Sequence, residues 1–215
     1  RILFLNSTLR AEYGDTGEKN WYRKKNACHK DFVERIKKVK YTLVFKPGTI
    51  LEDNKTCYSL RAANIEKVSG TIYNNFMTSN VFNPLGMMTT YVYNTRRTKR
   101  KTPANYALGY VYSDSLKRYM LPDSLPAYSY VYYLDGIVGD GCVNSTTGDL
   151  QKWDRALYEN SLVSKASLKE MLSPLVQRSA GDSTNYYGFV MMISPKTERG
   201  KVTSHTEGWQ VYRTM

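Results

Sequence analysis

The spacing of apolar residues changes along this chain of 215 residues, and this change constrains the fold more than any other feature. Between about residues 30 and 175, apolar side chains recur three or four positions apart, which is typical of amphipathic helices. Near the end, the stretches YYGFVMMIS and KVTSHTEGWQ flank a turn over residues 195–200. That pattern predicts two antiparallel strands. The chain is therefore expected to combine helices with an antiparallel hairpin.

Turn and capping residues predict where the helices begin and end. In the helix over residues 56–68, the inward-facing positions are expected to be Leu60, Ala63, Ile65 and Val68. Thr71 is expected to cap the following helix, and Thr146 with Asp149 forms a capping signature for a later one. That later helix carries Leu150, Trp153 and Leu157 at helical spacing, and Trp153 and Trp209 are predicted to pack inside. The tyrosine-rich residues 107–135 are expected to form strands or extended segments.

The net charge of +12 is concentrated in two runs, residues 21–40 and 94–103. Such runs can form a nucleic-acid footprint, but acidic residues interrupt the first run and turn signals flank the second. Solvated surfaces are the favoured interpretation, so a nucleic-acid partner is not expected. No stretch approaches 18 consecutive apolar residues, so no membrane span is predicted.

The cysteines and histidines predict neither a disulfide framework nor a metal site. Cys28, Cys57 and Cys142 are isolated from one another and odd in number, so they are interpreted as free thiols. His29 and His205 lie far apart and form no zinc pattern with them. No metal or cofactor is therefore expected. His29 lies in a basic, polar stretch and is predicted to be a surface histidine.

The order of several short segments resembles a known family. These segments are FKPGT (45–49), EKVSG (66–70), FNPLGMMTTY (82–91), ALGY (107–110), GDGCVNSTTGDLQKW (139–153), and YGF followed by SHTEGW near the end. Together, over roughly residues 30–215, they resemble the serine β-lactamase-related family. That family includes class C β-lactamases, D-alanyl-D-alanine carboxypeptidases and related esterases.

The resemblance implies an α+β fold of the β-lactamase/DD-peptidase type, with an antiparallel sheet flanked by helices and a mostly helical subdomain. Residues 1–215 would form one partial domain, mostly helical over about 30–175 and a sheet hairpin over about 185–215. The implied chemistry is acyl transfer through a serine, with a β-lactam, a D-Ala peptide or an ester as substrate. Family members usually work outside the cytoplasm, which implies a periplasmic or secreted protein.

The first family motif, Ser-x-x-Lys, does not occur, because no serine in the chain is followed by a lysine three positions later. The segment ILFLNSTLR resembles the stretch that follows the nucleophile helix in this family. The helix is therefore expected before Arg1. The family also continues beyond the final hairpin into a strand and a helix. The chain is thus predicted to be truncated at both ends.

The second motif, Tyr-x-Asn, is altered. An ungapped match from PGT to EKVSG places Asp53 at the tyrosine position and Lys55 at the asparagine position. Asp53 could accept a proton, although a carboxylate is shorter than a phenol and more acidic. Lys55 at the substrate-binding position cannot accept a hydrogen bond as an amide can.

The third motif is a strand with His or Lys, then Ser or Thr, then Gly. His205 and Thr206 fit this pattern and are predicted to contact a substrate carboxylate or the transition state. Glu207 replaces the glycine and should repel an anionic substrate group. Gly208 is predicted to supply a backbone N–H to the oxyanion hole.

These motifs leave three hypotheses. The first is a fragment of a serine hydrolase whose nucleophile lies elsewhere. The second is a catalytically inactive relative that binds a ligand or partner in the retained groove. The third, a basic nucleic-acid-binding module, depends on charge alone.

Overall fold

The computed structural model describes residues 28–38, 55–93, 105–128, 136–159, 161–178, 181–189, 191–209 and 212–214. The longer α-helices in these ranges are α2 (His29–Lys38), α3 (Lys55–Ser69), α6 (Thr147–Glu159) and α7 (Lys165–Met171). A shorter helix, α4 (Tyr73–Met77), continues into the π-helical turn η2 (Thr78–Phe82). The positions of α3, α4 and α6 agree with the helices predicted from apolar spacing and capping residues.

Within the described residues, the strands form one four-stranded antiparallel sheet and three two-stranded pairs. The larger sheet has the order β5 (Val176–Gln177), β6 (Tyr186–Tyr187), β7 (Met192–Thr197), β8 (Gly200–Ser204). The pairs are β1 (Tyr91–Val92) with β4 (Val143–Asn144), β2 (Val111–Ser113) with β3 (Arg118–Met120), and β9 (Glu207–Trp209) with β10 (Tyr212–Thr214). After β3, two 3-10 turns follow: η3 (Pro122–Ser124) and η4 (Pro126–Tyr128).

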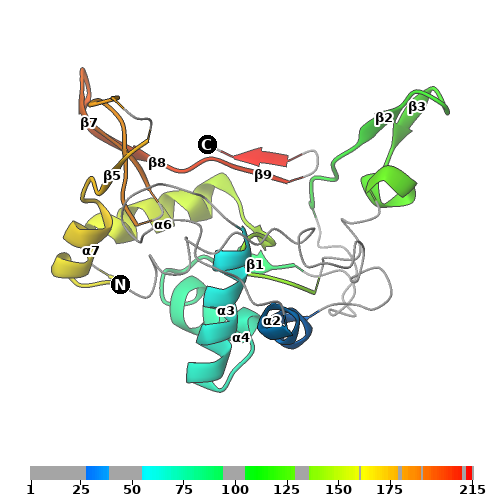
Figure 1. The fold of residues 1–215 in the computed structure, drawn as a ribbon, viewed down its shortest axis with the longest axis horizontal. Coiled ribbons are helices and arrows are strands. Elements are labelled where there is room, and N and C mark those ends of the chain that lie inside the picture. Colours follow the sequence, from blue (N-terminus) through cyan, green and yellow to red (C-terminus); the bar gives the residue numbers. More distant parts are fainter. Residues whose placement is uncertain are drawn as a thin grey trace.

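The two strands predicted for the final hairpin are four shorter strands in the structure, β6 to β9. YYGFVMMIS is split between β6 and β7, and β7 pairs with β8 through a register shift between Ser194 and Thr197 that accommodates Pro195. His205 and Thr206 were predicted inside a strand, which is wrong: they form the link between β8 and β9. The link lets β9 leave the larger sheet and pair with β10 (Figure 1).

The buried side of α3 differs from the predicted one. Val68, expected to face inward, is 89% exposed, whereas Thr56, Cys57, Ser59 and Ala62 are buried. Ala62 on α3 packs directly against the turn before β4. Gly139 has φ +101°, and a Cβ atom there would collide with the Ala62 side chain, so glycine permits this close approach.

The prediction for α6 is partly confirmed. The Thr146 hydroxyl accepts the Asp149 backbone N–H at 3.3 Å, as the capping signature indicated. The predicted inward face of α6 is wrong, however. Leu150 and Trp153 are exposed, whereas Asp149 and Ala156 are buried. Trp209, the other predicted packing tryptophan, has a side chain outside the described part of the structure.

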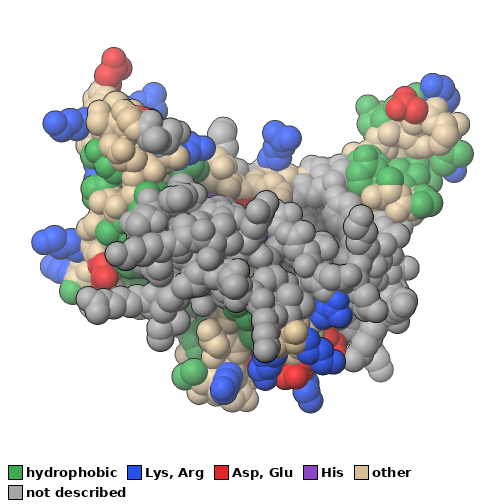
Figure 2. All heavy atoms as spheres, in the orientation of Figure 1, with side chains coloured by type: hydrophobic (Ala, Val, Ile, Leu, Met, Phe, Trp, Pro, Cys, Tyr) green, Lys and Arg blue, Asp and Glu red, His purple; other side chains and the backbone are tan. Residues whose placement is uncertain are grey.

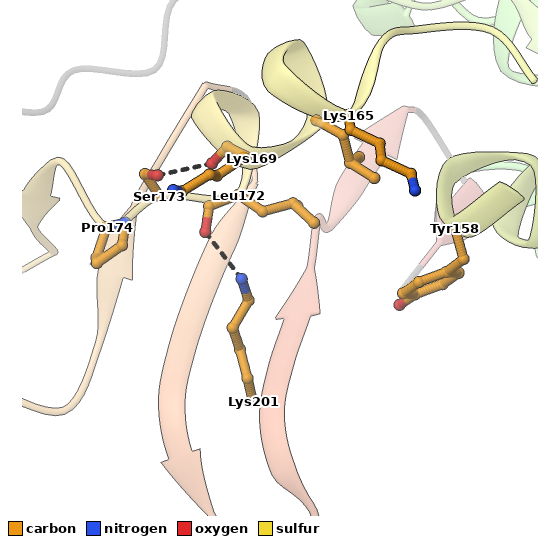
Figure 3. Close-up of a pocket in the computed structure, with 8 residues that line it drawn as sticks. Tyr158, Lys165, Lys169, Leu172, Ser173, Pro174 and Lys201 are labelled. Carbon is orange, nitrogen blue, oxygen red and sulfur yellow. Dashed lines mark hydrogen bonds between the residues drawn. The ribbon is translucent and has the colours of Figure 1, made fainter. Parts of the chain in front are cut away.

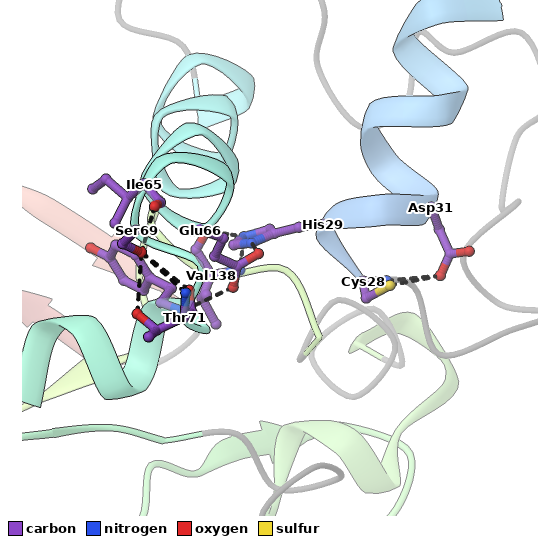
Figure 4. A network of polar contacts seen from close by, with 9 residues as sticks. Cys28, His29, Asp31, Ile65, Glu66, Ser69, Thr71 and Val138 are labelled. Carbon is purple, nitrogen blue, oxygen red and sulfur yellow. Dashed lines mark hydrogen bonds and ion pairs between the residues drawn. The ribbon is translucent and has the colours of Figure 1, made fainter.

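His29 was predicted at the surface, which is wrong: its side chain is buried and bonds to two other segments. Its side chain is 6% exposed, with Nδ1 2.9 Å from Glu66 Oε2 and Nε2 2.7 Å from the Val138 carbonyl oxygen (Figure 4). The other carboxylate oxygen of Glu66 accepts the Tyr73 backbone N–H at 2.9 Å. This satisfies a free donor at the start of α4, a role that was predicted for Thr71. One imidazole and one carboxylate thus join α2, α3, α4 and the turn before β4.

Asp149 forms a second buried polar centre. Its Oδ2 accepts the Thr89 backbone N–H at 2.8 Å and the Thr89 and Thr90 hydroxyls at 2.6 and 2.9 Å. Lys152 donates to Oδ1 at 2.8 Å and also to the Gly86 carbonyl. These contacts attach the 86–90 segment to the start of α6. The hydrogen bonds from Lys152 and Thr89 lower the pKa of the Asp149 carboxyl well below its ordinary value.

The β2–β3 hairpin stands away from the larger sheet, as Figures 1 and 2 show. Its paired residues Tyr112 and Tyr119 have ring centroids 5.3 Å apart in an edge-to-face arrangement. Both rings are exposed, as are the neighbouring Leu116 and Tyr110. Apolar side chains therefore gather on this hairpin at the surface.

We expect His29→Ala to lower the free energy of unfolding by about 2 kcal/mol, because it removes the imidazole that bonds to Glu66 and to the Val138 backbone. Chemical denaturation measures this value. Lys30→Ala, one position further along the same helix at an exposed site, is the control and should change stability little. Equal effects of the two variants would contradict the role given to His29.

We expect Asp149→Asn to lower Tm by about 5 °C or more at neutral pH. The native pKa of Asp149 is lowered, so its contribution is present above the unfolded pKa and is lost as pH falls through the native pKa. The difference in Tm between wild type and variant should therefore shrink below about pH 4. Thermal unfolding at several pH values checks this, with the exposed Asp154→Asn on the same helix as control. A difference independent of pH would argue against the charged hydrogen-bonded carboxylate.

Candidate functional site

The structure brings together residues of two altered motifs that lie far apart in the sequence. Lys55 is the first residue of α3, and its Nζ lies 3.9 Å from Oε2 of Glu207 on β9. The same Glu207 oxygen accepts the backbone N–H of Gly208 at 3.3 Å. Asp53, predicted at the tyrosine position, lies outside the described residues. The start of α3 and β9 thus form two sides of one candidate site.

The exposure of this ion pair indicates that it contributes little to stability. The side chains of Lys55 and Glu207 are 44% and 43% exposed. Exposed ion pairs typically contribute about 0.2–1 kcal/mol, because water already solvates both charges. The pair therefore matters more for the charges that it presents to a ligand than for holding the fold together.

The link between β8 and β9 presents His205 beside a tyrosine. His205 is half-buried, and its Nε2 lies 3.5 Å from the Tyr187 hydroxyl on β6, at the limit of a hydrogen bond. Thr206 is exposed next to it. Tyr187 could not be predicted as a neighbour of the motif, since the pairing of β6, β7 and β8 brings it there. A phenol, an imidazole and a hydroxyl are therefore available in this region for hydrogen bonding or proton transfer.

A tyrosine on β10 fixes the other end of the β9–β10 pair. The Tyr212 hydroxyl donates to the Ala107 carbonyl at 2.9 Å and accepts the Gly109 backbone N–H at 2.8 Å. Burial and a hydrogen bond with Tyr212 raise the pKa of Tyr106 well above its ordinary value. Tyr106 also packs against Tyr93, with ring centroids 5.3 Å apart. The site-bearing strand pair is thus held by contacts among tyrosines.

A shallow cavity of about 520 Å³ lies elsewhere, between α7, α6 and β8 (Figure 3). It is lined by Tyr158, Lys165, Leu168, Lys169, Leu172, Ser173, Pro174 and Lys201. Lys201 donates to the Leu172 carbonyl at 3.0 Å and so satisfies the end of α7. None of the predicted site residues within the described ranges lines this cavity.

The two Tyr-x-Asn strings elsewhere in the chain lie away from the predicted chemistry. Tyr73 starts α4, and burial raises its pKa, which disfavours the phenolate form. Tyr158 is exposed on α6 and lines the cavity beside α7. Within the described ranges, no group of three or more His, Cys, Asp or Glu residues is placed to bind a metal ion. No helix there is both long and apolar enough to cross a membrane.

Comparison with known proteins identifies the family. Residues 5–215 match the family described as Beta-lactamase. The chain belongs to the Beta-lactamase family. It is 42% identical to Penicillin-binding protein 4* of Bacillus subtilis (strain 168) over 197 residues, covering 91% of this chain and 43% of that protein. The chain therefore spans less than half the length of this curated relative.

Solved structures agree with the family and its fold. The octameric penicillin-binding protein homologue from Pyrococcus abyssi is 27% identical, with a TM-score of 0.62 over 80% of this chain and 36% of that one. A D-stereospecific amidohydrolase from Streptomyces sp. superimposes with a TM-score of 0.69 over 98% of this chain and 61% of that one, at 22% identity. The α+β fold of the β-lactamase/DD-peptidase type, predicted from the order of sequence segments, is confirmed.

Proposed function

We propose that the chain supplies the substrate-binding part of a serine hydrolase that cleaves amide or ester bonds through an acyl-serine. The similarity to Penicillin-binding protein 4* over 91% of the chain carries this proposal. The fold is also shared with D-amino acid amidase from Ochrobactrum anthropi and with a β-lactamase/D-alanine carboxypeptidase from Yersinia pestis. The substrate would be a small molecule or peptide: a β-lactam, a D-Ala peptide, an amide or an ester.

The residues of the site would have distinct roles. His205 and Thr206 would donate hydrogen bonds to the substrate, with Tyr187 holding the imidazole. The Gly208 N–H would stabilise the oxyanion once the Glu207 carboxylate releases that N–H, while the carboxylate stays beside Lys55. Asp53 would accept a proton at the position where the family has a tyrosine. The serine nucleophile would come from a Ser-x-x-Lys helix outside these 215 residues, since no serine in them has a lysine three positions later.

A binding-only relative is the second candidate. It is favoured by the charged residues Lys55 and Glu207, which occupy positions where the family has an amide and a glycine, and by the engagement of the Gly208 N–H with Glu207. Such a protein would retain the groove and bind a ligand without turnover. The two candidates differ in whether an acyl-enzyme can form.

The test compares the 215-residue chain with a protein extended upstream to include any Ser-x-x-Lys helix in the same reading frame. We expect the extended protein to form a covalent acyl-enzyme with a β-lactam or an activated ester, detected as a mass increase. The short chain should form none. Replacing the serine of that helix by alanine is the control and should abolish the mass increase.

If the extended protein stays inactive, Asp53→Tyr, Lys55→Asn and Glu207→Gly restore the family residues together. Activity gained by this triple variant would show that the altered residues block turnover and would favour the binding-only candidate for the natural sequence. An acyl adduct on the short chain alone would contradict the proposed origin of the nucleophile.

A further inference from the structure

The carboxylate of Glu207 fills a small anion-binding position inside the candidate site. One of its oxygens, Oε2, contacts both the Lys55 ammonium at 3.9 Å and the Gly208 backbone N–H at 3.3 Å. An ammonium and a backbone N–H converging on one oxygen are the groups that proteins use to bind a carboxylate. Here the carboxylate comes from the chain itself.

Among the described residues, the surrounding charges point to Lys55 as the cation of this position. Arg213 lies opposite Gly208 in the β9–β10 ladder. Adjacent residues of a strand point to opposite faces and directly paired residues share a face, so Arg213 projects away from the face that carries Glu207. His205 has Tyr187 beside its Nε2. Lys55 is therefore the charged donor that a ligand carboxylate would have to share with Glu207.

A tethered carboxylate competes strongly with a free one. The short side chain of Glu207 holds its carboxylate beside the two donors at an effective concentration that a dissolved anion reaches only in the millimolar range or above. A ligand carboxylate would also meet the negative charge of Glu207 if it entered beside it. A neutral amide or ester group suffers neither penalty.

We propose that Glu207 determines specificity: its carboxylate occupies an anion position formed by Lys55 and the Gly208 N–H, so the site takes amides or esters that carry no carboxylate there. This inference deepens the proposed function and, as a statement about substrates, rests on it. Its test, however, measures binding alone. Failure of catalysis and failure of this inference are therefore distinguishable.

The experiment titrates the 215-residue chain with two matched probes, N-acetylglycinate and N-acetylglycinamide, and follows the Gly208 amide signal by NMR. In wild type, the amide probe should bind at least as well as the carboxylate probe. In Glu207→Gly and in the isosteric Glu207→Gln, we expect affinity for N-acetylglycinate to rise about fivefold, the upper end of what an exposed ion pair contributes. Affinity for the amide probe should change by less than about threefold.

Two further variants identify the cause of the gain. Lys55→Gln in the Glu207→Gly background should remove the gain, because it removes the ammonium. Glu198→Gln removes the same negative charge from the exposed turn between β7 and β8 and should leave both affinities unchanged. Near-ultraviolet circular dichroism confirms that each variant is folded. Unchanged carboxylate affinity in both Glu207 variants, or a gain that survives Lys55→Gln, would overturn the inference.

Discussion

The imidazole of His29 holds together the part of the molecule from which the site is built. It contacts a carboxylate on α3 and both backbone groups of Val138, while that carboxylate also satisfies the first turn of α4. Ala62 and Val138, which belong to this region, lie in the main apolar cluster with Tyr73. A buried polar group without partners costs more than a formed hydrogen bond gains, so these elements must keep their relative positions together. The direction of α3, and with it the position of Lys55, depends on this centre.

Stability and ligand recognition are carried by different kinds of polar contact in this chain. His29 and Asp149 are almost completely buried, and each makes several short hydrogen bonds to separate segments. Lys55 and Glu207 are nearly half exposed and meet at 3.9 Å. The low effective dielectric makes the buried contacts strong, whereas water weakens the exposed pair and leaves it free to exchange partners. The exposed pair is therefore the one whose charges a ligand meets.

The sequence predicts the elements of this fold better than their buried faces. Helix positions follow from apolar spacing, and the Thr146 cap of α6 follows from its local signature, because both depend on residues close in sequence. The inward face of α3 could not be predicted, because Thr56 and Ser59 are buried while Val68 is exposed. Tertiary contacts decide these positions. The predicted exposure of His29 was wrong for the same reason, since its partners lie 37 and 109 residues away in the sequence.

The candidate site illustrates the same limit. The family resemblance identified Lys55 and Glu207 as departures from two different motifs. It did not indicate that the two side chains meet. Only the approach of α3 to β9 shows that the two departures carry opposite charges and meet. A lone lysine at this place would attract an anionic ligand, and a lone glutamate would repel one. Together their charges offset each other, and Glu207 also accepts the Gly208 N–H. The two substitutions are thus linked through one electrostatic contact, and a change at either position alters what the other presents to a substrate.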